Sequence, residues 1–279
     1  MPGRVFDGLS AAGERCGAVA GIHAASTVYA TGSGYHGRPT SMDHRMLSRL
    51  PPVTQALLIA NVALFLLQLM LGDATFAPFM LWPPSALGFD PFSPGQNFQV
   101  WQLLTYGFLH GGFAHLLFNM LALYMFGAPL ELTWGPRRFL AFYLISVAGA
   151  GLCQLLVGWW TVSSGGIAYP TVGASGGVFG LLMAFGLLFP NQRVMLLFPP
   201  IPMKARTFVI VIGAISLLMG LTGGWGLRPG EPGIAHFAHL GGMLFGWLVI
   251  RYWRGQPPFG GGGRRPPPRG GGSHLRRVK

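Results

Sequence analysis

Long apolar segments separated by short polar ones dominate the pattern of this sequence. Each of six segments has about 17 to 22 residues with almost no charged side chain, and about 20 apolar residues suffice for a helix to cross a bilayer. We therefore expect membrane-spanning helices at residues 53–72, 111–130, 139–160, 172–189, 207–223 and 234–253. The pattern predicts an all-α, polytopic membrane protein built as a six-helix bundle.

The two ends of the chain differ from this region. Residues 1–50 show no sustained apolar period and no apolar stretch typical of a secretory signal, so we expect a disordered extension. Residues 255–279 are rich in Gly, Pro and Arg and are expected to be a disordered, basic tail. The predicted organisation is an extension at 1–50, a membrane domain at 51–254 and a tail at 255–279.

Composition and charge agree with a membrane protein and narrow the classes of partner. Hydrophobic residues make up 51% of the chain and charged residues 9%, against about 25% in soluble domains. The net charge is +12, but 12 of the 19 bases lie outside residues 53–251. Basic ends beside a membrane typically contact anionic lipid headgroups. No aromatic residues alternate with these charges, so we do not expect nucleic-acid binding.

The positions of the loop bases predict the orientation of the chain. With six spans, one side of the membrane receives nearly all of the loop bases, and the opposite loops receive only Arg228. Basic loops stay in the cytoplasm, so both termini are expected there. A Gly/Pro/Arg-rich tail is common in high-GC bacteria, which suggests a bacterial inner membrane. The loop bases of the first side are Arg137, Arg138, Arg193, Lys204 and Arg206.

Polar side chains within the predicted spans are few, and they gather toward one side of the membrane. His115 and Asn119 are four residues apart and share a helix face in the second span. Ser175 begins the fourth span, and His236 and His239 lie near the start of the sixth. The starts of these three spans all face the extracytoplasmic side. Polar groups inside a membrane are costly and usually functional, so we expect a site at this depth.

A serine and a histidine at this depth suggest nucleophilic chemistry. A neutral imidazole within about 2.6–3.2 Å of a hydroxyl can take its proton. The start of the fourth span offers backbone N–H groups and the positive end of a helix dipole to an oxyanion. Close approach of the fourth and sixth spans is favoured by small residues four apart. These residues are Gly176 and Gly180 on one span, and Gly242 and Gly246 on the other.

Ordered motifs in the chain resemble the rhomboid intramembrane serine proteases, over about residues 53–253. Any single motif is weak, but the ordered set is specific. The motifs are Trp101-Gln102, His110-Gly-Gly-Phe-Ala-His115-Leu-Leu-Phe-Asn119, Gly173-Ala-Ser175-Gly176, Ala238-His239-Leu-Gly-Gly242 with Gly246, and Glu131 with Gly135 and Arg138-Phe139.

The resemblance implies a Ser–His dyad without a third acid. By it, Ser175 is the nucleophile and His239 the general base, while His115, Asn119 and the Ser175 backbone N–H stabilise the oxyanion. Phe179 would pack against the imidazole. No Asp or Glu lies inside a predicted span, in agreement with a dyad. The supporting positions are Gly173, Gly176, Phe179 and Gly242.

One position departs from the family pattern. The family often has Trp-Arg in the first loop, and Gln102 stands in place of the arginine. That arginine is structural in the family, so the departure concerns the conformation of the loop.

Other interpretations of these residues remain open. His236 is an alternative general base, Asn119 an alternative tie between two helices, and His110 a hydrogen-bonding partner at a helix start. Four histidines suggest zinc, but no His-Glu-x-x-His pattern and no carboxylate in the spans completes a site, so no metal or other cofactor is expected. Cys16 and Cys153 suggest neither a disulfide framework nor a metal site. A catalytically inactive relative that binds or escorts membrane proteins would be expected to lack the serine or the histidine.

The combined expectation is an intramembrane serine endopeptidase that cleaves transmembrane segments of membrane-protein substrates. Such segments must unwind first, because a helix hides its carbonyl groups. The loop at 73–99 and the fifth span are candidate gates.

Overall fold

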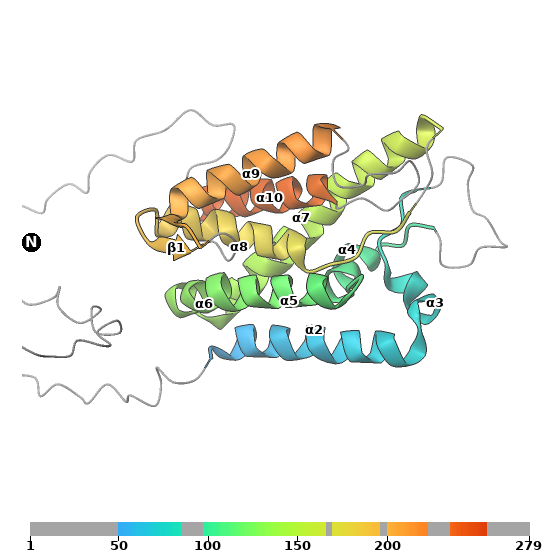
Figure 1. Cartoon of the computed structure of the whole chain (residues 1–279), viewed down its shortest axis with the longest axis horizontal. Helices are drawn as coiled ribbons and strands as arrows, with labels where there is room; N and C mark the ends of the chain where they lie inside the picture. The colour runs from blue at the N-terminus through green and yellow to red at the C-terminus, as the bar shows by residue number, and fades with distance from the viewer. Residues whose placement is uncertain (1–49, 85–96, 166–168, 196–199, 223–234, 256–279) are drawn as a thin grey trace, which may run out of the picture. The chain divides into compact units, whose positions relative to one another are not determined.

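The computed structural model describes residues 50–84, 97–165, 169–195, 200–222 and 235–255. Most of the predicted extension at 1–50 and of the predicted tail at 255–279 therefore lies outside the described residues. The elements, shown in Figure 1, are α2 (Pro52–Leu71), α3 (Asp73–Phe76), η1 (Ala77–Phe79), α4 (Gln102–Thr105), η2 (Tyr106–Phe108), α5 (Phe113–Ala122), η3 (Leu123–Gly127), α6 (Ala128–Trp134), α7 (Pro136–Ser163), α8 (Ser175–Leu188), β1 (Arg193–Met195), β2 (Pro202–Lys204), α9 (Ala205–Thr222) and α10 (His236–Trp253).

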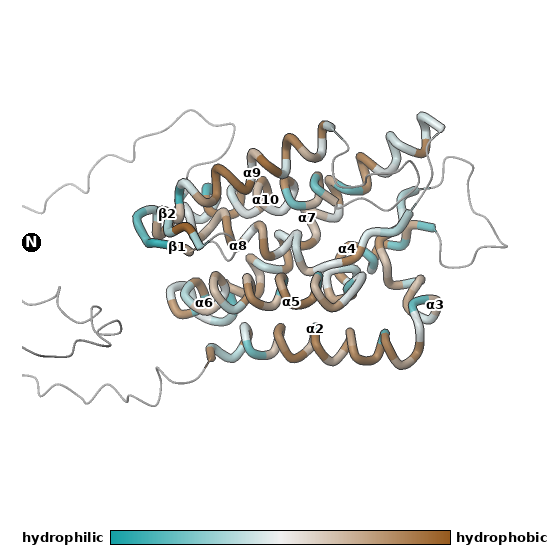
Figure 2. Tube along the Cα trace, in the orientation of Figure 1, coloured by the Kyte–Doolittle hydropathy of each residue, from teal (hydrophilic) through white to brown (hydrophobic). Residues whose placement is uncertain are grey.

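The predicted fold class, a polytopic helical membrane protein, is confirmed. Among the described residues, four helical segments are long and apolar enough to cross a membrane: 52–71, 113–134, 136–163 and 205–222. The helix α8 has only 14 residues, and α10 is less apolar because it carries histidines and glycines. Most residues of α8 are buried among the other helices. The outer helices α2 and α9 differ from α8 in position, and Figure 2 shows that they are hydrophobic along much of their length.

The predicted boundaries differ from the structure by up to four residues, and two of the differences concern the fourth and second spans. The fourth span begins at Ser175 and not near Val172, because Thr171 pairs with Leu81 in an isolated antiparallel bridge. The second span continues past residue 130 through a π-helical turn, η3, to Trp134. The expectation that no acid lies inside a span is therefore wrong for Glu131.

The Glu131 carboxylate ties α6 to the start of α2. It is 2% exposed and accepts hydrogen bonds from the backbone N–H groups of Val53 (2.9 Å) and Thr54 (2.7 Å). The Thr54 hydroxyl donates a third bond of 2.8 Å. These donors lie at the positive end of a helix dipole and stabilise the buried negative charge. The acid is thus a capping group far from the predicted dyad.

A small antiparallel hairpin, which the sequence analysis did not predict, joins α8 to α9. Its strands β1 and β2 pair Arg193 with Lys204, Val194 with Met203 and Met195 with Pro202. Strands of three residues are too short to produce a recognisable alternation of polar and apolar positions.

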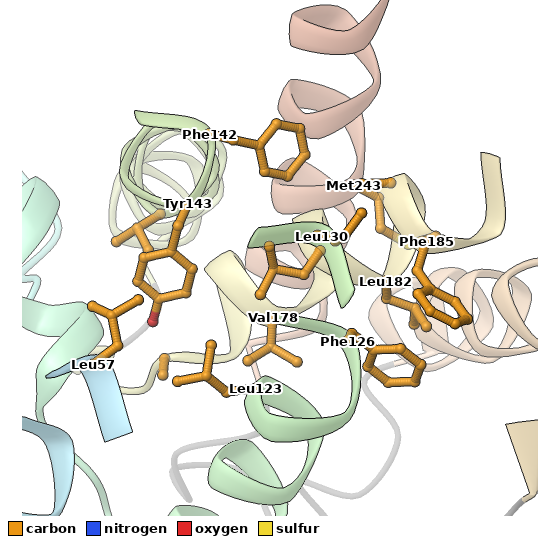
Figure 3. Close-up of a cluster of buried hydrophobic side chains, with 14 of the residues drawn as sticks. Leu57, Leu123, Phe126, Leu130, Phe142, Tyr143, Val178, Leu182, Phe185 and Met243 are labelled. Carbon is orange, nitrogen blue, oxygen red and sulfur yellow. The ribbon is translucent and has the colours of Figure 1, made fainter. Parts of the chain in front are cut away.

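The hydrophobic core surrounds α8. Figure 3 shows Phe126 of η3 beside Phe185 of α8, whose ring centroids are 5.2 Å apart. Leu182 of α8 is 4% exposed, and Met243 of α10 is 6% exposed. Because apolar side chains from neighbouring helices pack on it, α8 has a fixed position in the bundle.

The loop between α2 and α5 is organised around Gln102. This side chain is fully buried, and its Oε1 accepts the backbone N–H groups of Trp82 and Gln99, each at 3.2 Å. Its Nε2 donates to the carbonyls of Pro78 (3.1 Å) and Asn97 (3.2 Å). An arginine only donates, so it could not accept the two N–H groups. Gln102, which replaces the arginine of the Trp-Arg pattern, thus lies in a loop where its side chain both accepts and donates hydrogen bonds.

Replacing Gln102 with methionine is expected to destabilise the protein by about 3 kcal/mol, because buried backbone groups lose their partners without a large change in volume. Thermal unfolding of the purified protein in detergent measures the effect. The matched control is Gln55→Met, on the exposed surface of α2, which should change little. Equal losses in the two variants would contradict this account of Gln102.

Candidate active site

Ser175 is the first residue of α8, and the chain before it is tightly held. Gly173 has φ +132°, a conformation that favours glycine, and its N–H donates to the Tyr106 carbonyl at 2.9 Å. A Cβ on Gly173 would lie 2.7 Å from ring atoms of His115. The helical hydrogen bonds of α8 begin with the Val178 N–H, which donates to the Ala174 carbonyl at 3.0 Å. The N–H groups of residues 175–177 are therefore not used by the helix itself.

Ser175 and His239 meet although they are 64 residues apart. The distance between Ser175 Oγ and His239 Nε2 is 2.9 Å. The Phe179 ring stacks on the imidazole, with centroids 4.0 Å apart and planes inclined by 10°. Both members of the pair are half-buried. The imidazole is thus held between an aromatic ring and a hydroxyl.

Glycines on α8 and α10 allow this approach. A Cβ on Gly242 would overlap the carbonyl oxygen of Gly176. A Cβ on Gly246 would lie 3.1 Å from the Cα and the oxygen of Gly180. The two small-residue faces predicted from the sequence are therefore packed against each other, and backbone meets backbone. No larger residue fits at the Gly242 contact without moving a helix.

His115 lies next to the pair with a defined orientation. Its Nδ1 accepts the Gly111 N–H at 3.4 Å, and in a neutral imidazole the other nitrogen then carries the proton. That nitrogen, Nε2, is on the part of the ring that faces Gly173. A Cβ at Gly173 would also lie 3.6 Å from Ser175 Oγ, which places the hydroxyl on the same side. His115 Nε2 and Ser175 Oγ therefore both lie beside Gly173.

The structure separates the remaining candidates. The side-chain amide of the buried Asn119 donates to the His115 carbonyl at 3.0 Å, and among the described residues no bond joins it to Ser175. The His110 ring packs edge-on against His115 at 5.2 Å. The His236 ring lies 5.9 Å from that of His239, while the bond to Ser175 belongs to His239.

A contact that sequence analysis missed positions the chain before Ser175. The backbones of Leu81 and Thr171 exchange two hydrogen bonds of 3.0 Å and 2.9 Å. This bridge fixes the first loop to the segment that enters α8. Two isolated residues 90 positions apart carry no local signal, so no motif could have revealed the pairing.

The arrangement suits acyl transfer. It places a hydroxyl beside an imidazole, at the start of a helix whose first N–H groups are not used by the helix itself. Within the described ranges, no three His, Cys, Asp or Glu side chains lie close enough together to hold a metal ion.

Apolar spans around a serine–imidazole pair define an integral, polytopic helical membrane protein. Residues 97–255, more than half of the chain, match the family model described as "Rhomboid domain", and the chain therefore belongs to the rhomboid family. It is also 30% identical over 227 residues to RHOMBOID-like protein 4 of Arabidopsis thaliana. The match covers 72% of this chain and 52% of the plant protein, so the chain spans about half the length of that relative.

Proposed function

We propose that this protein is an intramembrane serine endopeptidase that hydrolyses peptide bonds in transmembrane segments. The single observation that carries the proposal is the 2.9 Å contact between Ser175 Oγ and His239 Nε2. A protein that only binds or escorts membrane proteins has no need of this pair.

In the proposed reaction, Ser175 Oγ attacks the substrate carbonyl carbon while His239 Nε2 takes the hydroxyl proton. The C–N bond then breaks, and the imidazolium gives its proton to the leaving amine. Water attacks the acyl-enzyme with His239 again as the base, which releases the acid and regenerates the serine. Phe179 contributes by keeping the ring in the plane required for both transfers.

The tetrahedral intermediate carries a negative charge on oxygen. We assign its stabilisation to the backbone N–H of Ser175, at the positive end of α8, and to Nε2–H of His115. Each such donor contributes about 10²–10³-fold to the rate. The Asn119 side-chain amide has two N–H groups, of which one donates to the backbone carbonyl of His115. We assign the second N–H to the same oxyanion.

The short α8 supports cleavage below the membrane surface. Its 14 residues rise about 21 Å, against roughly 30 Å of hydrocarbon. If its C-terminal end lies at one surface, where the basic residues Arg193 and Lys204 follow, Ser175 lies roughly 10 Å below the other surface. A substrate helix would have to unwind there, so helix-breaking small residues near the cut are expected.

The charge asymmetry supports cytoplasmic termini and cleavage near the extracytoplasmic side. The Gly/Pro/Arg-rich tail supports a bacterial inner membrane, whereas the relative described above is from a plant. The membrane-protein substrates and the lipid bilayer are the proposed partners, and nucleic acid is not among them.

A fluorophosphonate probe tests the proposal, because it reacts with activated serines. The purified wild-type protein is expected to be labelled, and Ser175→Ala is expected to lose the label completely. The matched control is Ser164→Ala, which removes an exposed hydroxyl at the end of α7 and should leave labelling unchanged. Equal labelling of Ser175→Ala and wild type would remove Ser175 as the nucleophile. A folded wild-type protein that takes no label and cleaves no substrate would favour the inactive binder.

A further inference from the structure

Two cations face each other on the hairpin between α8 and α9. Arg193 and Lys204 are cross-strand partners, and both are exposed. Directly opposed side chains project from the same face of a two-stranded ribbon, and like charges in this arrangement repel. The neighbouring Val194 is 5% exposed and turns inward, which fixes the face that carries the charges. The repulsion would be relieved by an anion bound between the two side chains.

The described part of the chain does not supply that anion. Its acids are Asp73 and Glu131. Asp73 follows the C-terminal end of α2, and Glu131 is buried in its hydrogen bonds to the N-terminal end of that helix. The seven described bases lie at the start of α7, in or next to the hairpin, and at the end of α10. Neither of the two described acids therefore pairs with Arg193 or Lys204.

A cavity of about 380 Å³ with mostly apolar walls has Gln192 and Arg193 in its lining. Its walls come from the end of α8, from η3 and α6, and from β1, and they include Phe126, Phe185 and Phe189. Met195, next to the charged pair, is 62% exposed. Figure 2 shows hydrophilic positions along the trace of the hairpin and hydrophobic positions along the neighbouring helices.

We propose that the Arg193–Lys204 pair and this cavity form a binding site for one anionic phospholipid. The phosphodiester lies between the guanidinium and the ammonium groups, and an acyl chain occupies the cavity walled by the phenylalanines. Free inorganic phosphate would satisfy the charges but leave the apolar walls unused. An uncharged lipid would fill the cavity but would leave the two cations without a counter-charge. The site lies at the opposite end of α8 from Ser175, and it does not depend on peptide hydrolysis.

Native mass spectrometry of the full-length protein in detergent tests the proposal, with phosphatidylglycerol and phosphatidylcholine of equal chain length as probes. The wild type should retain one phosphatidylglycerol at collision energies that remove phosphatidylcholine. The double variant R193Q/K204Q should bind phosphatidylglycerol about tenfold more weakly or worse, since each basic residue contributes to binding at an anionic membrane surface. The variant R193K/K204R keeps both charges and should retain the lipid.

The matched control is R137Q/R138Q, which removes two charges from the same end of the bundle, at the start of α7. It should leave the retained lipid in place. Equal loss in both double variants would show general attraction of lipid to basic residues and would overturn a specific site. So would phosphate ions that displace the lipid at millimolar concentration, because the ligand would then be a soluble anion.

A second variant, Met125→Trp, keeps both hairpin charges and tests the proposal even if R193Q/K204Q fails to fold. Met125→Trp adds bulk at a wall of the cavity, and it should weaken retention of phosphatidylglycerol by about tenfold while leaving the hairpin cations in place. Unchanged retention in this variant would overturn the assignment of the cavity to the acyl chain.

Discussion

Replacing His239 with alanine is expected to lower kcat for cleavage of a transmembrane substrate by about 10⁴- to 10⁶-fold. The reason is that the imidazole is the group that bonds the Ser175 hydroxyl, at 2.9 Å. Without it, the proton has no acceptor in the attack and the leaving amine has no donor. Cleavage in proteoliposomes measures the rate, and fluorophosphonate labelling of Ser175 should fall in parallel.

The matched control for this prediction is His236→Ala, one helical turn earlier on α10. The His236 ring lies 5.9 Å from that of His239 and does not bond the serine, so this variant should keep most of its activity. Thermal unfolding of both variants separates a lost base from a lost fold. An active His239→Ala protein together with an inactive His236→Ala protein would reverse the assignment of the base.

Replacing Gly242 with alanine is expected to lower activity by about 100-fold, although no reacting group is touched. The added methyl group would overlap the carbonyl oxygen of Gly176, which belongs to the backbone and cannot rotate away. The helices α8 and α10 must then separate, and the Ser175–His239 distance increases. A misplacement of about 1 Å costs roughly this factor in rate. Overpacking should also lower the free energy of unfolding by about 1–3 kcal/mol.

Gly213→Ala on α9 is the control for this effect. It adds the same methyl group within a helix, but the nearest atom is the terminal carbon of Met243, at 3.2 Å. A methionine side chain can rotate, and alanine favours helix over glycine by up to about 1 kcal/mol, so this variant should be neutral or slightly stabilised. If both glycine variants behave alike, close backbone packing is not what holds the dyad together.

Local sequence patterns predicted the class of the protein but not the contacts between distant residues. The apolar segments predicted the helical membrane class, because each span must satisfy its own backbone and present apolar side chains to lipid. They could not predict that Glu131 would lie inside a helix, since its partners Val53 and Thr54 are nearly 80 residues away. Gln102 was noticed only as a departure from a motif. Its four backbone partners became evident only in the folded loop.

The sequence by itself determined which chemistry-bearing residues the protein has and at which span starts they occur. Ser175, His115 and His239 could be named because polar groups are rare in apolar spans and these ones share a predicted depth. The tertiary structure decided which imidazole bonds the serine, which nitrogen of His115 faces the site, and that Asn119 bonds to its own helix. It also created the opposed Arg193–Lys204 pair. Such relations depend on how helices and strands pack across long separations in the chain, and neighbouring residues do not encode them.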